Sequence, residues 1–146
     1  MVGANQSIMN EKQKNKVIME AIDPLNRTVK LFDHTWLHII SKHSDDFTSY
    51  EEIREVIENP LIIAQSEQKE NRQFYYRYNS STSNYSAVIV EDNTNSLFVV
   101  TAYKTDNQKV KFVPPIFYAK TGSPWRFYFF VSRISCRLFC FSSEAP

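Results

Sequence analysis

The sequence predicts an α+β fold, with two short helices packed on one face of an antiparallel β-sheet of about four to five strands. Two observations predict this class. Two segments with helical spacing of apolar residues come early in the chain, within residues 34–58. Four segments rich in β-branched and aromatic residues follow between residues 61 and 103. Because helices and strands are segregated along the chain, a doubly wound parallel sheet is excluded.

The elements before the first helix are short. Residues 17–22 form an apolar segment that stops at Asp23 and Pro24, because proline disfavours helix in the residue before it. Residues 27–32 then alternate, with Val29 and Leu31 on one face and three other side chains on the opposite face. This alternation predicts a short strand.

The first helix is expected over residues 34–42, with Asp33 as its N-cap. Its apolar residues crowd one broad side of the helix: Trp36, Leu37, Ile39 and Ile40. An amphipathic helix of this kind must bury that side against another element.

The second helix is marked by an apolar stripe at positions i, i+3 and i+4, formed by Ile53, Val56 and Ile57. Two residue pairs before this stripe have the spacing of a capping box, Thr48 with Glu51 and Ser49 with Glu52. Asn59 and Pro60 end this helix, because proline cannot continue it.

Four strands are expected after the second helix, over residues 61–65, 73–78, 85–90 and 96–103. Polar runs of Ser, Asn, Asp and Glu separate them by distances typical of hairpins. No apolar run reaches the roughly 18 to 20 residues that a bilayer-spanning helix needs. The pattern therefore excludes an integral membrane protein with helical spans.

The length of 146 residues is enough for one domain with a core but not for two. We expect a polar lead-in over residues 1–16, a globular domain over residues 17–111 and an extension over residues 112–146. The extension is rich in aromatic residues, and residues 127–131 could form a last strand, bind a partner or belong to an unrelated tail. So many clustered aromatics predict a peripheral segment or self-association.

The charge balance is nearly neutral, with 17 basic and 16 acidic residues and a net charge of +1. The chain therefore has no overall field for capturing a polyanion, and any nucleic-acid site must be a local patch. The two cysteines, Cys136 and Cys140, cannot form the framework of a small secreted protein. No signal peptide is recognisable at the N-terminus, so a cytoplasmic location is expected.

The three histidines, His34, His38 and His43, fall within ten positions. Histidine is the side chain best suited to act as acid and base near neutral pH, although each one alone could serve only packing or a surface. His34 and His38 are i, i+4 neighbours and could form a metal pair. The H-E-x-x-H pattern is absent and no third ligand is evident, so neither a metal nor a cofactor is expected.

The segment 33–45, followed by the helix that ends at Asn59 and Pro60, resembles the phage-associated nuclease-toxin domains grouped with barnase, EndoU, colicin and RelE (the BECR fold). Those domains open with a helix motif of His-Ile, a basic residue and His. They also have an aromatic strand, matched here by residues 74–78, and a closing strand ending in Thr-Ala-Tyr, matched by residues 98–104. The resemblance covers residues 28–104. The sequence departs from the family at Ser44, where proline is typical, and in the tail beyond Lys111, which the resemblance does not cover.

The resemblance implies metal-independent RNA cleavage, in which the ribose 2′-hydroxyl attacks the adjacent phosphate. This chemistry needs a base, an acid and donors or cations around the phosphorane. The catalytic candidates that it implies are His43 or His38 as the base or the acid, with Thr101 and Tyr103 as donors to phosphate oxygens. The substrate-binding candidates are Lys42, Tyr76, Arg77 and Lys104. The implied partners are an RNA substrate and a cognate inhibitor or antitoxin.

Two other functions fit the same residues. One is a non-catalytic binding module on the same scaffold, because fold does not fix function. The other is a reader of single-stranded nucleic acid that stacks bases on the aromatic side chains of residues 74–78. Thr101, the tyrosines and the lysines could also have purely structural or solvated roles. Of the three functions, only the nuclease needs His43.

Overall fold

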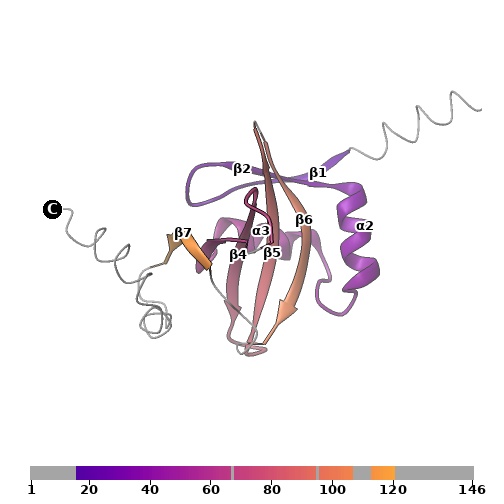
Figure 1. The fold of residues 1–146 in the computed structure, drawn as a ribbon. Coiled ribbons are helices and arrows are strands. Elements are labelled where there is room, and N and C mark those ends of the chain that lie inside the picture. Colours follow the sequence, from indigo (N-terminus) through magenta and orange to yellow (C-terminus); the bar gives the residue numbers. More distant parts are fainter. Residues whose placement is uncertain (1–15, 67, 95, 107–112, 121–146) are drawn as a thin grey trace, which may run out of the picture.

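The computed structural model describes residues 16–66, 68–94, 96–106 and 113–120. Within these ranges the elements follow in the order β1 (Val17–Ile22), β2 (Thr28–Phe32), α2 (Asp33–Lys42), α3 (Tyr50–Glu58), β3 (Ile62–Gln65), β4 (Arg72–Asn79), β5 (Asn84–Asn93), β6 (Ser96–Thr105) and β7 (Val113–Ala119). The strands form one seven-stranded sheet in the order β1-β2-β6-β5-β4-β3-β7. Helix α3 lies behind the sheet and α2 beside its β6 side (Figure 1).

The α+β class is confirmed, but the predicted sheet was wrong in two respects. It has seven strands rather than four to five within the described residues, and it is mixed rather than antiparallel. The parallel contact joins β2 to β6, where Val29 pairs with Leu97 and Lys30 with Phe98. This pairing is set by how the β1–β2 hairpin docks on the rest of the sheet, so local sequence patterns carry no sign of it.

The helix-side core forms where α2, α3 and the β1–β2 hairpin meet the sheet. Ile53, Val56 and Ile57 of α3, the predicted apolar stripe, are all buried in it. Ile39 of α2 is fully buried in the same cluster. A second, smaller cluster lies among Ile62, Ala64, Tyr76, Tyr85 and Ala87, whose side chains point to the opposite face of the sheet. The sheet therefore has a helix-side face and an opposite face that no helix of the described residues covers, which we call the open face.

A buried polar network fastens the turn between β1 and β2 to β4. The carboxylate of Asp23, 3% exposed, accepts hydrogen bonds from the backbone N–H groups of Leu25 and Arg27, from Arg27 Nε and from the Tyr75 hydroxyl. Arg27 also donates to the side chain of Gln73. Burial and the bond to Asp23 raise the pKa of Tyr75, so its hydroxyl remains a donor. The network joins residues about fifty positions apart.

The helix starts differ in detail from the predictions. Phe32, not Asp33, is the N-cap of α2, and Asp33 is the first helical residue. Ser49 is the N-cap of α3 but makes no side-chain cap bond. Instead the carboxylate of Glu52 accepts from the backbone N–H and the hydroxyl of Thr48. Asn59 follows the end of α3 as predicted.

Strand β7 comes from the segment expected to be a peripheral extension. It pairs antiparallel with β3, with Ile62 opposite Ala119 and Ile63 opposite Tyr118. The first part of the extension thus adds an edge strand to the sheet. Residues 127–131 and both cysteines lie outside the described residues. Neither helix of the described ranges has the length and apolar character needed to cross a membrane.

Candidate functional site

The candidate site lies along the outer edge of β6. Strand β2 pairs with β6 only near Leu97 and Phe98, and α2 with the loop that follows it flanks the rest of the edge (Figure 1). Within that loop, Asp46 Oδ2 accepts from the backbone N–H of Lys104 at 3.0 Å. This bond satisfies a donor on the outer side of the strand, which would otherwise need another partner. Side chains of α2 and β6 are thereby held next to each other.

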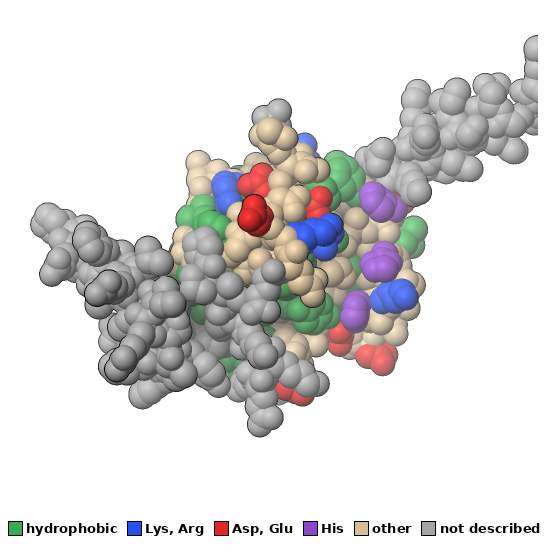
Figure 2. Space-filling view, in the orientation of Figure 1, with side chains coloured by type: hydrophobic (Ala, Val, Ile, Leu, Met, Phe, Trp, Pro, Cys, Tyr) green, Lys and Arg blue, Asp and Glu red, His purple; other side chains and the backbone are tan. Residues whose placement is uncertain are grey.

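The histidine side chains gather on the side of the molecule where α2 lies (Figure 2). His34 and His38 are exposed and one turn apart on α2. Lys42 is also exposed and follows His38 by four positions, so it continues the same face of the helix. The face therefore presents two imidazoles and one ammonium group to a ligand.

His43 follows the last residue of α2, and its side chain lies near a carboxylate and an aromatic ring. It is the C-cap residue, and its backbone N–H donates to the carbonyl of Ile39 at 2.7 Å. Its Nδ1 lies 3.5 Å from Asp46 Oδ2, and its ring centroid lies 6.1 Å from that of Tyr103. About a third of its side chain is exposed (34%). The imidazole is thus oriented by a carboxylate and still open to a substrate.

Thr101 and Tyr103 share the open face of β6, as their spacing predicts. Their partners on β5 are Ile89 and Ala87, and the Tyr103 ring packs against the cluster on the open face. Burial raises the pKa of Tyr103, so at neutral pH its phenol is a donor and not a base. Both hydroxyl-bearing residues can therefore donate hydrogen bonds.

Two of the predicted substrate cations lie on the other face. Arg77 and Lys104 both pair with Ser86 of β5, from opposite sides, and all three point toward α3. Arg77 forms an ion pair with Glu55 and also donates to the carbonyl of Asn59. Because the structure brings these cations to acidic residues of α3, they stand apart from Thr101 and Tyr103.

The side chain of Lys104 contacts a carboxylate and an aromatic ring. Its ammonium lies 3.5 Å from Glu52 Oε2 and 5.3 Å from the centre of the Phe47 ring. Burial acts to raise the pKa of Glu52, but hydrogen bonds from Thr48 and the charge of Lys104 hold it below its usual value. Lys104 thus links β6 to the start of α3.

Tyr76, the remaining substrate-binding candidate, is on the open face but is almost fully covered, at 5% exposure. Its ring stacks on that of Phe74, with centroids 5.7 Å apart. A buried ring of this kind contributes to packing, so the partly exposed Phe74 is better placed than Tyr76 to meet a ligand.

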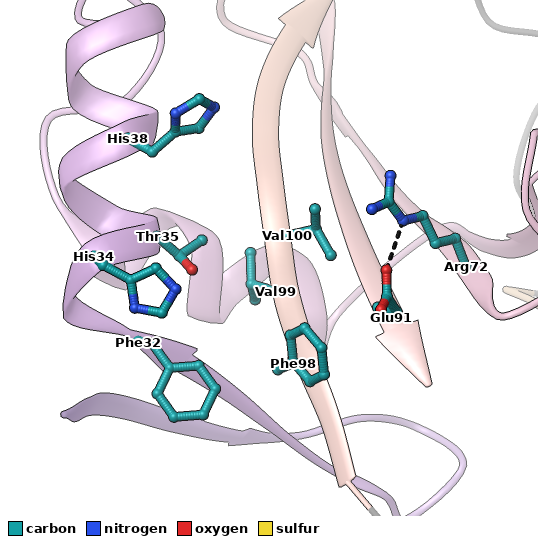
Figure 3. A pocket seen from close by; sticks show the side chains of 9 residues that line it. All are labelled: Phe32, His34, Thr35, His38, Arg72, Glu91, Phe98, Val99 and Val100. Carbon is teal, nitrogen blue, oxygen red and sulfur yellow. Dashed lines mark hydrogen bonds and ion pairs between the residues drawn. The ribbon is translucent and has the colours of Figure 1, made fainter. Parts of the chain in front are cut away.

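A hollow of about 720 Å³ lies between α2 and the strands β4, β5 and β6 (Figure 3). It is lined by Phe32, His34, Thr35, His38, Arg72, Glu91, Phe98, Val99 and Val100. His34 and His38 point into it from α2, and Arg72 lies on the far side of β6 (Figure 3). The hollow therefore joins the histidine face of α2 to the open face of the sheet.

Several of these lining residues were missed by sequence reasoning. Arg72 pairs with Glu91 across β4 and β5 with an Nε to Oε2 distance of 2.8 Å. Their opposite charges, nineteen positions apart, become neighbours only through the register of the hairpin. Phe98 was noted only as part of the closing-strand motif. Aligning β4 with β5 across their hairpin would have placed Arg72 opposite Glu91 and so predicted this ion pair.

Among the described residues no group of three or more His, Cys, Asp or Glu side chains could hold a metal ion. A scan against protein-family models gives no match for the chain, and searches of curated proteins and of solved structures give none. The arrangement of side chains at β6 is therefore the ground for a functional proposal.

Proposed function

We propose that this chain is a metal-independent endoribonuclease whose active site lies at the outer edge of β6. The observation that carries the proposal is the placement of His43 between Asp46 and Tyr103, at an open rim beside the exposed His38. A titratable imidazole that is oriented by a carboxylate and placed beside a phenol donor fits proton transfer better than packing.

In the proposed reaction His43 accepts the proton of a ribose 2′-hydroxyl. The 2′-oxygen then forms a bond to the adjacent phosphorus, and the bond from phosphorus to the 5′-oxygen breaks. His38, in its protonated form, gives a proton to the leaving 5′-oxygen. The products are a 2′,3′-cyclic phosphate and a free 5′-hydroxyl, and no oxidant, metal or cofactor takes part in these steps.

Negative charge builds on the phosphate oxygens as the new bond forms, so donors aimed at them stabilise the transition state. Thr101 and Tyr103 share the open face and fit this role. Lys42 is the substrate cation of the proposal, because it lies on the histidine face of α2. Arg77 and Lys104 are instead assigned to holding α3 on the sheet, through Glu55 and Glu52.

The biological setting is part of the same proposal. By its resemblance to phage-associated nuclease-toxin domains, the chain would act as a toxin on RNA and be held in check by a cognate inhibitor or antitoxin. An inhibitor of this kind would cover the edge of β6 and the exposed histidine face of α2. Acidic side chains would suit that surface, because His38 and Lys42 are both exposed on it.

The test is cleavage of end-labelled RNA by the full chain, with and without EDTA. We expect cleavage in both conditions and products ending in a cyclic phosphate. His43→Asn keeps a side chain able to reach Asp46 but cannot transfer a proton, and should lower the rate about 10² to 10⁴-fold. Lys42→Ala should lower it less, whereas Lys69→Ala, an exposed lysine in the β3–β4 turn, serves as the matched control.

A second function is favoured by one observation, the aromatic side chains on the open face. Phe74, Tyr78 and Tyr103 are partly buried there and could stack with bases, as a reader of single-stranded nucleic acid would require. RNA binding without cleavage by the wild-type protein, unchanged in His43→Asn, would replace the nuclease proposal with this one.

A further inference from the structure

The hollow between α2 and β6 has the size and the mixed lining of a small-molecule site. Its volume of about 720 Å³ lies within the range of ligand pockets, about 300 to 1,000 Å³. One wall is formed by α2 and the other by the paired strands β4 and β5 (Figure 3). Of the side chains that line the hollow, only His38 takes part in the proton transfers proposed for RNA cleavage.

The polar side of the hollow is suited to an anion. Arg72 uses its Nε to bond Glu91, and its two terminal guanidinium nitrogens point away from Glu91 toward the hollow (Figure 3). His38 points toward the same space from the opposite wall. A guanidinium presents several N–H donors in a fixed fork that fits the oxygens of a phosphate. Glu91 fixes the guanidinium plane and offsets part of its charge.

The aromatic side of the hollow is suited to a flat, apolar ring. The Phe32 and His34 rings are stacked, with centroids 5.8 Å apart and planes 20° from parallel. Phe98 meets Phe32 edge to face at 6.1 Å and is only partly buried. The Phe98 side chain lies between the α2 wall and the Arg72–Glu91 pair (Figure 3). A planar group stacked on Phe98 would thus have an anion site within reach.

We propose that this hollow binds one nucleotide unit of a single RNA strand, with its phosphate on the terminal guanidinium nitrogens of Arg72 and its base on Phe98. The proposal rests on the proposed function in taking RNA as the ligand. A nucleotide would use both the anion site and the stacking surface. A free phosphate would use only the anion site, and an apolar ligand would use only the stacking surface, so the combination selects a nucleotide. Since Val100 joins the hollow to Thr101 along β6, the unit bound here would neighbour the scissile phosphate.

The experiment measures the dissociation constants of uridine 5′-monophosphate, uridine and inorganic phosphate by NMR titration of the full chain. None of these ligands has a bond that the proposed reaction cleaves, so wild-type protein can be used. We expect the nucleotide to bind at least about tenfold more tightly than either fragment, because it makes both contacts. Amide shifts should centre on residues 98–100 and on α2.

Three variants separate the two contacts. Arg72→Met removes the charged donor and should weaken nucleotide and phosphate binding about tenfold or more. Glu91→Gln removes the offsetting charge but keeps a partner for the Arg72 Nε, and should strengthen binding of both. Phe98→Ala should weaken nucleotide binding about fivefold or more and leave the affinity for phosphate unchanged. Thermal midpoints show whether each variant is folded, and Glu91→Gln tests the proposal even if Arg72→Met does not fold.

The outcomes distinguish this inference from the proposed nuclease activity. Saturable nucleotide binding with the expected variant effects, but no RNA cleavage, supports the site and contradicts the nuclease. RNA cleavage at wild-type rate by Arg72→Met, with no saturable nucleotide binding by the wild type, overturns the site and keeps the nuclease. Equal affinity for nucleotide and phosphate, or no effect of Phe98→Ala, also overturns it, because a stacking surface would then have no role.

Discussion

Replacing Asp23 with alanine removes the acceptor that joins the β1–β2 turn to β4. Four donors lose their partner, namely the backbone N–H groups of Leu25 and Arg27, Arg27 Nε and the Tyr75 hydroxyl. Arg27 keeps its bonds to Gln73 at 3.0 Å and to the Tyr75 hydroxyl at 2.9 Å. The guanidinium would then remain within the structure without a counter-charge.

Breaking a buried ion pair by removing one partner costs about 3 to 5 kcal/mol. The Arg27 side chain is 28% exposed, so water can replace part of the lost contact, and we expect a loss near the lower limit, about 3 kcal/mol. For a domain of about 100 residues this corresponds to a fall of roughly 12 °C in the melting temperature. Such a loss is a large part of the usual stability of one domain.

The assay is urea unfolding at pH 7, followed by circular dichroism, together with scanning calorimetry. Asp23→Asn keeps an oxygen that can accept from the backbone N–H groups, so it should cost less, about 1 to 2 kcal/mol. Glu20→Ala is the control, because Glu20 is 57% exposed and lies 3.8 Å from Lys30, and it should cost less than about 0.5 kcal/mol. If the free energy of unfolding of Asp23→Ala lies within about 1 kcal/mol of the wild-type value, the hydrogen bonds of Asp23 do not stabilise the contact between the β1–β2 turn and β4.

Three further predictions follow from the core, the helix start and the site. Although burial acts to raise it, the pKa of Glu52 is held low by Thr48 and Lys104, so its contribution to stability is fully present above its unfolded pKa and is lost as the pH falls through its folded pKa. The loss of stability in acid, measured by unfolding below about pH 4.5, should therefore be shallower in Glu52→Gln. Ile39→Ala should destabilise by about 2 to 5 kcal/mol in urea because the side chain is fully buried, whereas Leu37→Ala, at 54% exposure, should change little. Tyr103→Phe should slow RNA cleavage about 10² to 10³-fold. The shape of the pH–rate profile between about pH 6 and 9 should not change, because a phenol with a raised pKa stays protonated there. A changed shape would contradict the role of Tyr103 as a hydrogen-bond donor.

Local sequence patterns determined most of the elements. Alternation and helical spacing predicted α2 and α3 to within one or two residues, because capping positions, apolar stripes and the proline after Asn59 are local signals. They also predicted β4 and β5, whose bounds the structure extends by one to three residues. The histidine cluster was evident from sequence alone, since all three histidines fall within ten positions.

The faces of the sheet were decided by tertiary structure, and β6 shows why. Simple alternation from Leu97 and Val99 would place Thr101 and Tyr103 on the same, helix-side face. In the structure Val99 pairs with Val90 but Thr101 pairs with the adjacent Ile89, so Val100 is an extra residue in a bulge. The bulge moves Thr101 and Tyr103 to the open face and buries Ala102 instead.

The same principle governs the charged residues. Arg77 and Lys104 meet acidic residues of α3, and Arg72 meets Glu91, only because the registers of β4, β5 and β6 bring them into line. A register shift of one residue would reverse each of these placements. Sequence therefore determined which residues are chemically suited to a site, whereas strand register and one bulge decided which of them lie on the same face. The reason is that side-chain direction in a sheet depends on pairing between segments far apart in the chain.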